Sequence, residues 1–266
     1  MNKIADKTEQ IRRNQTSSGE HLSPKTGRVL IAVATYNEID NLPIFVERLA
    51  DTLPNVDLLV IDDGSPDGTG DWCLQEAKVN PHIHCLHRQG KPGLGSAIIA
   101  AMKYAVAHDY EVMVNLDADL SHPPEMIPLF LEAWEENDPG ATVVIGSRYI
   151  KGGGIQGWPW KRHMMSKAIN FYTRWLLWLP MADCSGSFRA YPVKLLKQVD
   201  FDSFLSQGYS FFEEILYHLK REGAQFVEVP FTFVERQYGA SKISLQKAMV
   251  AVGTIFRLGM KVWFRA

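Results

Sequence analysis

Short apolar runs alternate with segments of helical spacing over the first half of the chain. Five runs have the length of buried strands, and all but the third are almost continuously hydrophobic: Val29 to Thr35, Leu58 to Asp62, Ile83 to His87, Val112 to Asp117 and Thr142 to Ser147. Such runs are typical of parallel strands covered on both faces. Apolar positions with helical spacing lie between them, in Leu42 to Leu53, Gly95 to Ala107 and Pro124 to Trp134. The pattern predicts an α/β fold with a mostly parallel open sheet and helices on both faces.

The pattern changes near Tyr149. Three consecutive glycines at positions 152 to 154 predict a flexible joint, and the segment from Lys161 to Leu179 then mixes aromatic residues and leucine with Lys and Arg. Further elements are expected near Phe188 to Tyr191 (strand), Phe212 to Arg221 (helix), Gln225 to Val234 (strand) and from Lys242 (helix). We therefore divide the chain into a disordered polar tail at residues 1–27, one α/β domain at 28–242 and a C-terminal amphipathic helix at 243–266.

The charge and cysteine content exclude several classes of protein. Lys and Arg number 28 against 30 Asp and Glu, a net charge of -2, so no overall cationic field attracts nucleic acid and we expect no nucleic-acid partner. Three cysteines without a CxxC pair argue against a disulfide framework or a cysteine zinc site, and fit a reducing cytoplasm. The polar N-terminal tail has no apolar core of a secretory signal.

No apolar run reaches the roughly 18 to 20 residues that a spanning helix needs. Aromatic residues interspersed with Lys and Arg nevertheless predict a helix lying at a bilayer surface, with the segment from Ile255 to Phe264 as a second contact. The alternative is a core helix that packs on the sheet. The aromatic residues concerned are Trp158, Trp160, Phe171, Trp175 and Trp178.

Carboxylates follow the predicted strands at the edge where an open α/β sheet binds its ligand. Asp117 and Asp119 come directly after the fourth run, and at the strand period of two both would point the same way. Two such carboxylates, together with a substrate diphosphate, form a common site for a hard divalent ion. The alternative is a solvated turn that caps a helix at Pro123.

Two further loops at this edge contain residues that could bind a nucleotide. Asp62 ends the second apolar run, where a carboxylate is costly unless it is hydrogen-bonded, for example to a base or a ribose. A turn that caps the next helix explains the nearby Asp67 and Thr69. The glycine-rich loop from Gly90 to Ser96 opens a helix and could present backbone amides and Lys91 to a phosphate. Its spacing is not that of a Walker A loop, and loop packing explains it equally well.

Several cations fall in loops or at element ends. They are either solvated charges or the means of holding a second, anionic substrate, because the rigid fork of Arg matches phosphate. These cations are Arg148, Lys161, Arg162, Arg236 and Lys242.

In their order along the chain, these segments resemble the glycosyltransferases of family 2 with the GT-A fold, and among them the dolichol-phosphate mannose synthases. The resemblance runs from about Arg28 to Lys242. Ala34 stands where many relatives have Pro, and Ser121 where some have Gln. The segments that carry the resemblance are Ala34 to Glu38, Val60 to Thr69, Lys91 to Ala97, Asp117 to Glu125, Gly146 to Tyr149, Gly152 to Trp158 and, more specific to the polyprenyl-phosphate branch, Ser185 to Arg189 and Tyr238 to Lys242.

The resemblance implies transfer of mannose, with inversion, from GDP-mannose to dolichyl or another polyprenyl monophosphate. It also implies a peripheral position on the cytoplasmic face of a membrane, reached either directly or through a membrane-anchoring subunit. The alternatives are a glucosyltransferase that uses UDP-glucose and a non-catalytic subunit that binds nucleotide-sugar.

The resemblance also implies a role for each matching residue. No general base is expected, because the acceptor phosphate is already an anion at neutral pH. The donor would be bound by Thr35, Tyr36, Glu38, Asp62, Asp63, Lys91, Gly93, Asp117 and Arg148; Mg²⁺ or Mn²⁺ by Asp117, Asp119 and Ser121; the acceptor phosphate by Arg162, Ser166, Arg236 and Lys242; and the catalytic residues would be Asp119, Arg148 and Arg236.

Overall fold

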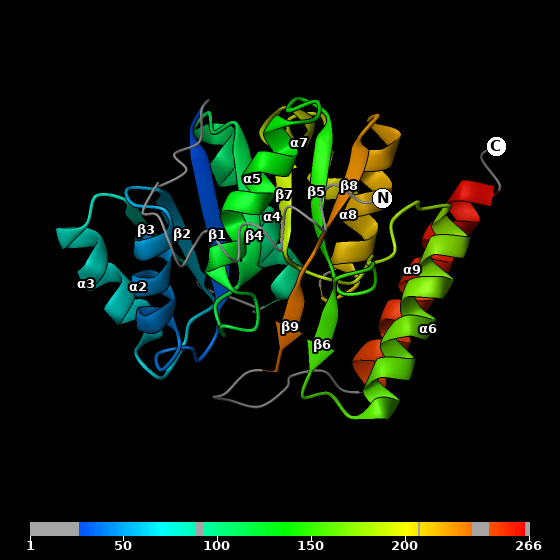
Figure 1. The fold of residues 1–266 in the computed structure, drawn as a ribbon, viewed down its shortest axis with the longest axis horizontal. Helices are drawn as coiled ribbons and strands as arrows, with labels where there is room; N and C mark the ends of the chain where they lie inside the picture. The colour runs from blue at the N-terminus through cyan, green and yellow to red at the C-terminus, as the bar shows by residue number, and fades with distance from the viewer. Residues whose placement is uncertain (1–26, 89–92, 207, 236–244, 264–266) are drawn as a thin grey trace.

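The computed structural model describes residues 27–88, 93–206, 208–235 and 245–263 (Figure 1). Within them one sheet of seven strands has the order β3-β2-β1-β4-β7-β5-β8. Only β7 is antiparallel to its neighbours. The strands are β1 (Val29–Thr35), β2 (Asp57–Asp62), β3 (Ile83–His87), β4 (Val112–Asp117), β5 (Thr142–Ser147), β7 (Arg189–Pro192) and β8 (Gln225–Pro230). The predicted sheet is confirmed, and of its five predicted strands only β2 differs, starting one residue earlier.

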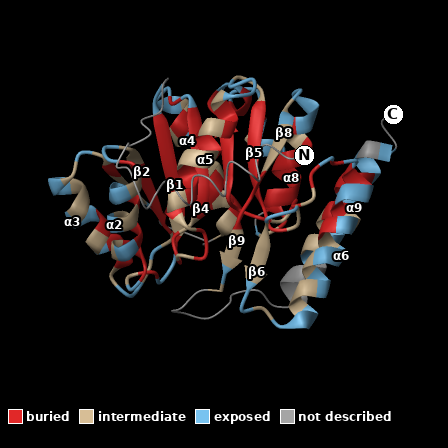
Figure 2. Ribbon diagram, in the orientation of Figure 1, coloured by how far each residue is buried: buried red, intermediate tan, exposed pale blue. Residues whose placement is uncertain are grey.

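Helices cover both faces of this sheet. Because successive strand side chains point to opposite faces, β1 divides its apolar residues between two layers. Ile31 and Val33 pack with α2 (Leu42–Thr52), α3 (Thr69–Val79), the 3₁₀ turn η1 (Pro124–Met126) and α5 (Ile127–Glu135). Leu30 and Ala32 pack with α4 (Leu94–Ala107), α7 (Val193–Leu196) and α8 (Phe211–Arg221). Burial of both strand faces explains the continuous hydrophobic runs, and Figure 2 shows the sheet as the buried centre of the molecule.

A second, two-stranded sheet lies beside the carboxyl end of β5. It pairs β6 (Gly154–Gln156) with β9 (Thr232–Val234) in parallel. The single strand predicted from Gln225 to Val234 is therefore divided, because β8 pairs with β5 and β9 with β6. At the predicted flexible joint the glycines are required by close packing and backbone conformation: a Cβ on Gly153 would lie 2.4 Å from the Ser147 backbone oxygen, and Gly152 has a φ of 93°. Gly152 and Gly153 form a tight turn packed on the ends of β5 and β8, and Gly154 begins β6.

Helices α6 (Trp160–Leu177) and α9 (Leu245–Trp263) pack against each other at one side of the molecule (Figure 1). Leu176, Ile255 and Leu258 are buried between them and the body of the protein. The predicted start of the last helix, Lys242, lies outside the described residues. Among the residues that are described, no helix combines the length and the apolar character needed to cross a membrane.

The outer face of α6 exposes large aromatic side chains. Phe171 is 72% exposed, and Trp160, Trp175 and Trp178 are exposed to a similar degree, whereas the inner face of the helix is buried. Trp158 does not share this surface, contrary to the prediction. It precedes the helix, is half-buried, and packs edge-on against Phe233 and His163.

Candidate active site

Thr35 and Asp62 end neighbouring strands at the carboxyl edge of the sheet. The Asp62 carboxylate is fully buried and is bonded entirely within the chain. It accepts hydrogen bonds from Thr35 Oγ1 (3.2 Å), from Ser65 Oγ (2.5 Å) and from the N–H groups of Gly64 and Ser65 (3.1 Å each), and it lies 3.2 Å from His87 Nδ1. These contacts explain how a carboxylate is tolerated at the end of an apolar strand without a ligand, since it shapes the turn that follows β2.

Asp63 connects the same turn to the start of α4. Its carboxylate accepts from Arg88 Nη1 (2.8 Å) and from the N–H of Gly93 (3.0 Å), and Arg88 Nη2 donates to Ser96 Oγ (2.8 Å). Arg88 therefore belongs to this edge, although the sequence analysis did not single it out. The available signal was its position directly after β3. Lys91 lies outside the described residues.

Tyr36 and Glu38 follow β1 at this edge. Tyr36 is 39% exposed, while Glu38 is nearly buried and accepts from Asn41 Nδ2 at 2.8 Å. The N–H of Glu38 donates to Thr69 Oγ1 (3.0 Å), so α3 holds the loop after β1 in place. The structure thus gathers the side chains predicted to bind a nucleoside along the ends of β1 and β2.

The two carboxylates after β4 differ in exposure. The Asp117 side chain is 38% exposed and accepts from Ser187 Oγ at 2.9 Å. Asp119 is buried, and its Oδ1 accepts from the hydroxyl (2.5 Å) and the N–H (3.1 Å) of Ser121. Two carboxylates and a hydroxyl are hard oxygen donors, which suit Mg²⁺ or Mn²⁺. No group of three or more His, Cys, Asp or Glu in the described part of the chain is arranged to hold a metal.

His122 contacts the end of β4. Its Nδ1 accepts the N–H of Asp117 at 3.1 Å, and its ring packs against Phe188 and Phe231. Burial lowers the pKa of His122, which agrees with a neutral ring that accepts at Nδ1. The sequence analysis quoted this histidine only as part of a motif; its position within the loop that carries Asp119 was the signal.

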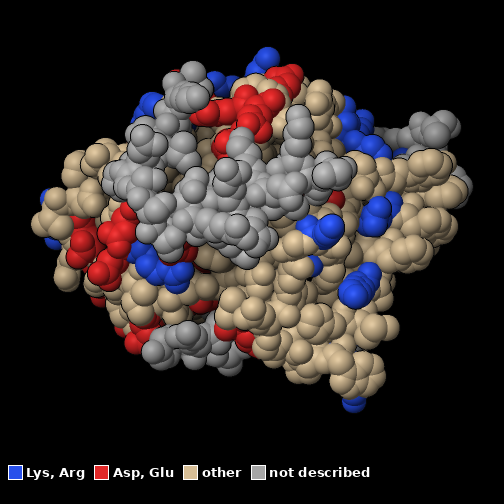
Figure 3. Space-filling model, viewed as in Figure 1, with Lys and Arg blue, Asp and Glu red and all other residues tan. Residues whose placement is uncertain are grey.

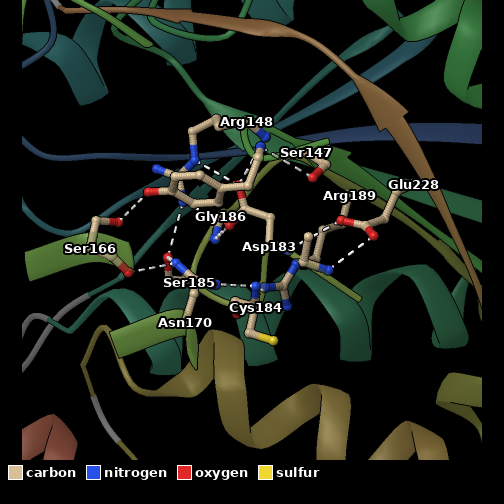
Figure 4. Close-up of polar contacts among 12 residues, drawn as sticks. Ser147, Arg148, Ser166, Asn170, Asp183, Cys184, Ser185, Gly186, Arg189 and Glu228 are labelled. Carbon is tan, nitrogen blue, oxygen red and sulfur yellow. Dashed lines mark hydrogen bonds and ion pairs between the residues drawn. The ribbon is translucent and has the colours of Figure 1, made fainter. Parts of the chain in front are cut away.

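Arg148, after β5, forms a buried ion pair with Asp183 (Figure 4). Nε and Nη2 of Arg148 donate to the two carboxylate oxygens at 2.7 and 2.8 Å, and its backbone N–H donates to Oδ2 at 3.1 Å. Burial alone would raise the pKa of Asp183, but the Arg148 guanidinium outweighs it and holds that pKa below its ordinary value. Asp183 therefore fixes the arginine predicted to meet the donor, and the sequence analysis missed it.

The segment that carries Asp183 is held from two sides. Glu228 of β8 accepts the N–H groups of Ala182 (2.9 Å) and Asp183 (3.1 Å). Asn170 of α6 accepts those of Cys184 (2.6 Å) and Ser185 (3.2 Å) (Figure 4). Ser185 Oγ in turn accepts from Arg148 Nη2 at 3.0 Å. Asn170 thus connects the aromatic helix to the arginine of the candidate site.

We expect Asn170→Leu to lower the free energy of unfolding by roughly 2 to 4 kcal/mol. The change keeps the shape of the side chain but leaves the buried N–H of Cys184 and the half-buried N–H of Ser185 without an acceptor; a fully buried group costs about 1 to 3 kcal/mol, and a half-buried one less. Urea unfolding checks this. Thr173→Val on the same helix is the control, because the buried Thr173 hydroxyl has no hydrogen-bond partner among the described residues. Equal losses in the two variants would contradict the prediction.

Two of the four residues predicted to bind an acceptor phosphate, Arg162 and Ser166, lie at the start of α6. Arg162 and Ser166 are one helical turn apart, on one face. Arg162 Nη1 donates to Glu235 Oε1 (2.6 Å), and Ser166 Oγ accepts from Tyr149 Oη (2.6 Å). Arg236 and Lys242 lie outside the described residues, so the structure tests neither. It does bring Arg162, Ser166 and Arg148 to the same end of the sheet.

A mixed α/β sheet with carboxylates at the ends of β2 and β4 is typical of one class of protein. Comparison with known proteins identifies the family. The model of the family "Glycosyl transferase family 2" matches residues 30–200, which is more than half of the chain. The protein therefore belongs to glycosyl transferase family 2 and is a glycosyltransferase. The fold predicted from the resemblance is confirmed.

Two bacterial relatives are similar over nearly the whole chain. An undecaprenyl-phosphate mannosyltransferase of Micrococcus luteus is 44% identical over 233 residues, covering 88% of this chain and 94% of that protein. A polyprenol monophosphomannose synthase of Mycolicibacterium smegmatis is 41% identical over 231 residues, covering 85% and 86%. Both belong to the branch that the sequence analysis selected.

Solved structures share the fold at low sequence identity. Glucosyl-3-phosphoglycerate synthase of Mycobacterium tuberculosis, in complex with Mn²⁺, UDP and glucosyl-3-phosphoglycerate, matches with a TM-score of 0.61 at 14% identity, covering 89% of this chain and 79% of that one. The mannosyltransferase PcManGT of Pyrobaculum calidifontis, in complex with GDP-Man and Mn²⁺, matches with a TM-score of 0.58 at 16% identity, covering 99% and 72%. These similarities establish the GT-A architecture.

Proposed function

We propose that the protein transfers mannose from GDP-mannose to a polyprenyl monophosphate. The observation that carries this proposal is the 44% identity, over nearly the full length of both chains, to an undecaprenyl-phosphate mannosyltransferase. The carboxylates at the ends of β2 and β4 and the arginines at the end of β5 and the start of α6 support it, because they provide places for a nucleotide-sugar and for a second phosphate.

The reaction is a single displacement at the anomeric carbon. An oxygen of the acceptor phosphate forms the new bond to mannose, the bond to the donor diphosphate breaks, and GDP leaves with inversion at carbon. The acceptor oxygen is already anionic at neutral pH, so no side chain has to remove a proton. What the protein supplies is the alignment of two phosphate groups that repel each other, and positive charge beside them.

Separate groups of residues would hold the donor and the acceptor. The bound divalent ion would supply positive charge beside the leaving diphosphate. Arg148, fixed by Asp183, would add a guanidinium on the same side. The donor nucleotide would meet Thr35, Tyr36, Glu38, Asp62, Asp63, Lys91 and Gly93; Mg²⁺ or Mn²⁺ would meet Asp117, Asp119 and Ser121; the acceptor phosphate would meet Arg162, Ser166, Arg236 and Lys242.

The test is transfer of radiolabel from GDP-mannose to a polyprenyl phosphate in detergent, with UDP-glucose in a parallel reaction, in Mg²⁺, Mn²⁺ or EDTA. We expect metal-dependent label in the lipid phase from GDP-mannose. Label from UDP-glucose alone would replace the donor and keep the acceptor. The absence of label from both would contradict the proposal, unless adding a membrane subunit restored transfer.

The polyprenyl chain of the acceptor requires an apolar environment, and we propose that α6 and α9 supply it by lying on the cytoplasmic face of a membrane. Both helices contain Lys and Arg but no Asp or Glu. Figure 3 shows Lys and Arg on the surface over these helices. Exposed aromatic rings beside cations suit the boundary between headgroups and acyl chains. The exposed rings are Trp160, Phe171, Trp175, Trp178, Phe256 and Trp263.

Replacing Phe171 and Trp175 together by Ser should weaken binding to vesicles containing phosphatidylglycerol by about 10- to 100-fold. Burial of one such side chain contributes roughly 1.5 to 3 kcal/mol, part of which a shallow surface contact retains. Vesicle flotation measures the effect. Val79→Ser is the control, because Val79 is 78% exposed on α3, on the other side of the molecule. Unchanged binding by the double variant would exclude α6 as the membrane contact.

A further inference from the structure

One aromatic ring lies within reach of both arginines of the candidate site. The Cζ atom of Arg162 is 4.0 Å from the centroid of the Trp158 ring, and that of Arg148 is 5.6 Å from it. Both distances fall within the roughly 6 Å over which a cation interacts with the face of an indole. Trp158 belongs to the loop between β6 and α6, and the edge-on rings of Phe233 and His163 hold it there.

The two arginines depend on this ring to different degrees. Arg148 is fixed by the bidentate pair with Asp183 and by Ser185, so its position is set without the indole. Arg162 donates from Nη1 to Glu235, and its side chain is 22% exposed. Among the described residues this is the only hydrogen bond of that side chain, and a guanidinium held through one nitrogen can turn about that bond. A flat ring 4.0 Å away restricts this rotation, because the guanidinium and the indole are both planar.

Trp158 interacts with the two arginines through the face of its ring. The indole Nε1–H is buried and has no acceptor among the described residues. In the described part of the chain, ring contacts rather than a hydrogen bond therefore hold the side chain in place. A large aliphatic side chain could fill the same volume, but it would offer no negative potential to a cation.

We propose that Trp158 is a positioning residue, which fixes the plane of the Arg162 guanidinium for the acceptor phosphate and sets its separation from Arg148. The inference rests on the proposed function, in which Arg162 meets the acceptor phosphate. The ring touches neither phosphate in this arrangement. It acts through the arginine, so its loss affects the acceptor more than the donor.

The test replaces Trp158 in the full-length protein by mono-, di- and trifluorinated tryptophan. These analogues nearly keep the shape of the ring, and each added fluorine reduces the negative potential on its face. We expect the KM for the polyprenyl phosphate to rise at each step, by about 3- to 30-fold in total, with the KM for GDP-mannose changed less than about twofold. The same series at Trp72 of α3 is the control. Among natural residues, Trp158→Phe should lie between the unmodified protein and Trp158→Leu.

The possible outcomes distinguish a failure of this inference from a failure of the proposed function on which it rests. If Arg162→Ala raises the KM for the acceptor but the fluorinated series leaves it unchanged, the inference is overturned and the proposed function stands. The same holds if the series changes both KM values equally. Calorimetric binding of citronellyl phosphate gives the comparison without turnover: its Kd should rise along the series. If the unmodified protein does not bind it, the acceptor site fails, and the inference fails with it.

Discussion

Asp119→Asn should reduce metal-dependent transfer by at least about 10³-fold, on the order of 4 kcal/mol in the barrier. The Asp119 carboxylate is buried and accepts two hydrogen bonds from Ser121, so the amide can occupy the same place while it removes the negative charge. Without that charge, the divalent ion of the proposed site would lose a buried carboxylate ligand. The measurement is label transfer over a titration of Mg²⁺ and of Mn²⁺.

Two variants calibrate this result. Ser121→Ala keeps both carboxylates and removes only the hydroxyl, so its effect should be smaller than about tenfold. Asp71→Asn removes an exposed carboxylate from α3 and should have no effect. Transfer by Asp119→Asn at the wild-type rate would show that the carboxylates after β4 do not hold the metal.

The largest loss of stability is expected from Asp183→Asn. The side chains of Arg148 and Asp183 are 7% and 0% exposed, so the change leaves a buried guanidinium without its counter-charge. Breaking such a pair from one side costs about 3 to 5 kcal/mol. Because Asp183 also orients Arg148, kcat should fall together with stability. Chemical unfolding and label transfer measure the two effects.

The control is a carboxylate paired at the surface. Asp202 lies 3.2 Å from Lys103, but its side chain is 91% exposed, and such pairs contribute about 0 to 1 kcal/mol. Asp202→Asn should therefore unfold almost like the wild type.

The pKa of Asp183 is lowered in the folded protein, so its stabilising contribution is present at neutral pH and is lost as the pH falls through that lowered value. A penalty of Asp183→Asn that did not shrink in acid would contradict this account.

The strands were predictable because burial on both faces leaves a local record in the sequence. Runs such as Val112 to Asp117 are apolar at consecutive positions and end where the chain leaves the sheet. Asp117 and Asp119 could be placed for the same reason. The exposed face of α6 was also predictable, since its aromatic residues recur along one helix.

Contacts between segments far apart in the sequence could not be predicted from local patterns of this kind. Asp183 follows Arg148 by 35 positions, and they meet because β7 enters the sheet antiparallel, between β4 and β5. Trp158 was grouped with the surface tryptophans, because sequence proximity does not reveal that β6 and β9 pair and bring Phe233 edge-on against the ring. The binding and catalytic roles of all the predicted site residues remain predictions, and Arg236, Lys242 and Lys91 also lie outside the described residues.

The segment before β7 has a consequence for building chimeric enzymes from this family. Within five residues it contacts Arg148 through Asp183 and Asp117 through Ser187. An exchange that took β4 with Asp117 from one parent and the stretch from 148 onward from another would keep Arg148 with Asp183 but would separate Asp117 from Ser187. A hybrid designed to change the lipid acceptor should therefore inherit β4, the end of β5 and residues 183–189 from a single parent, and exchange the start of α6 separately.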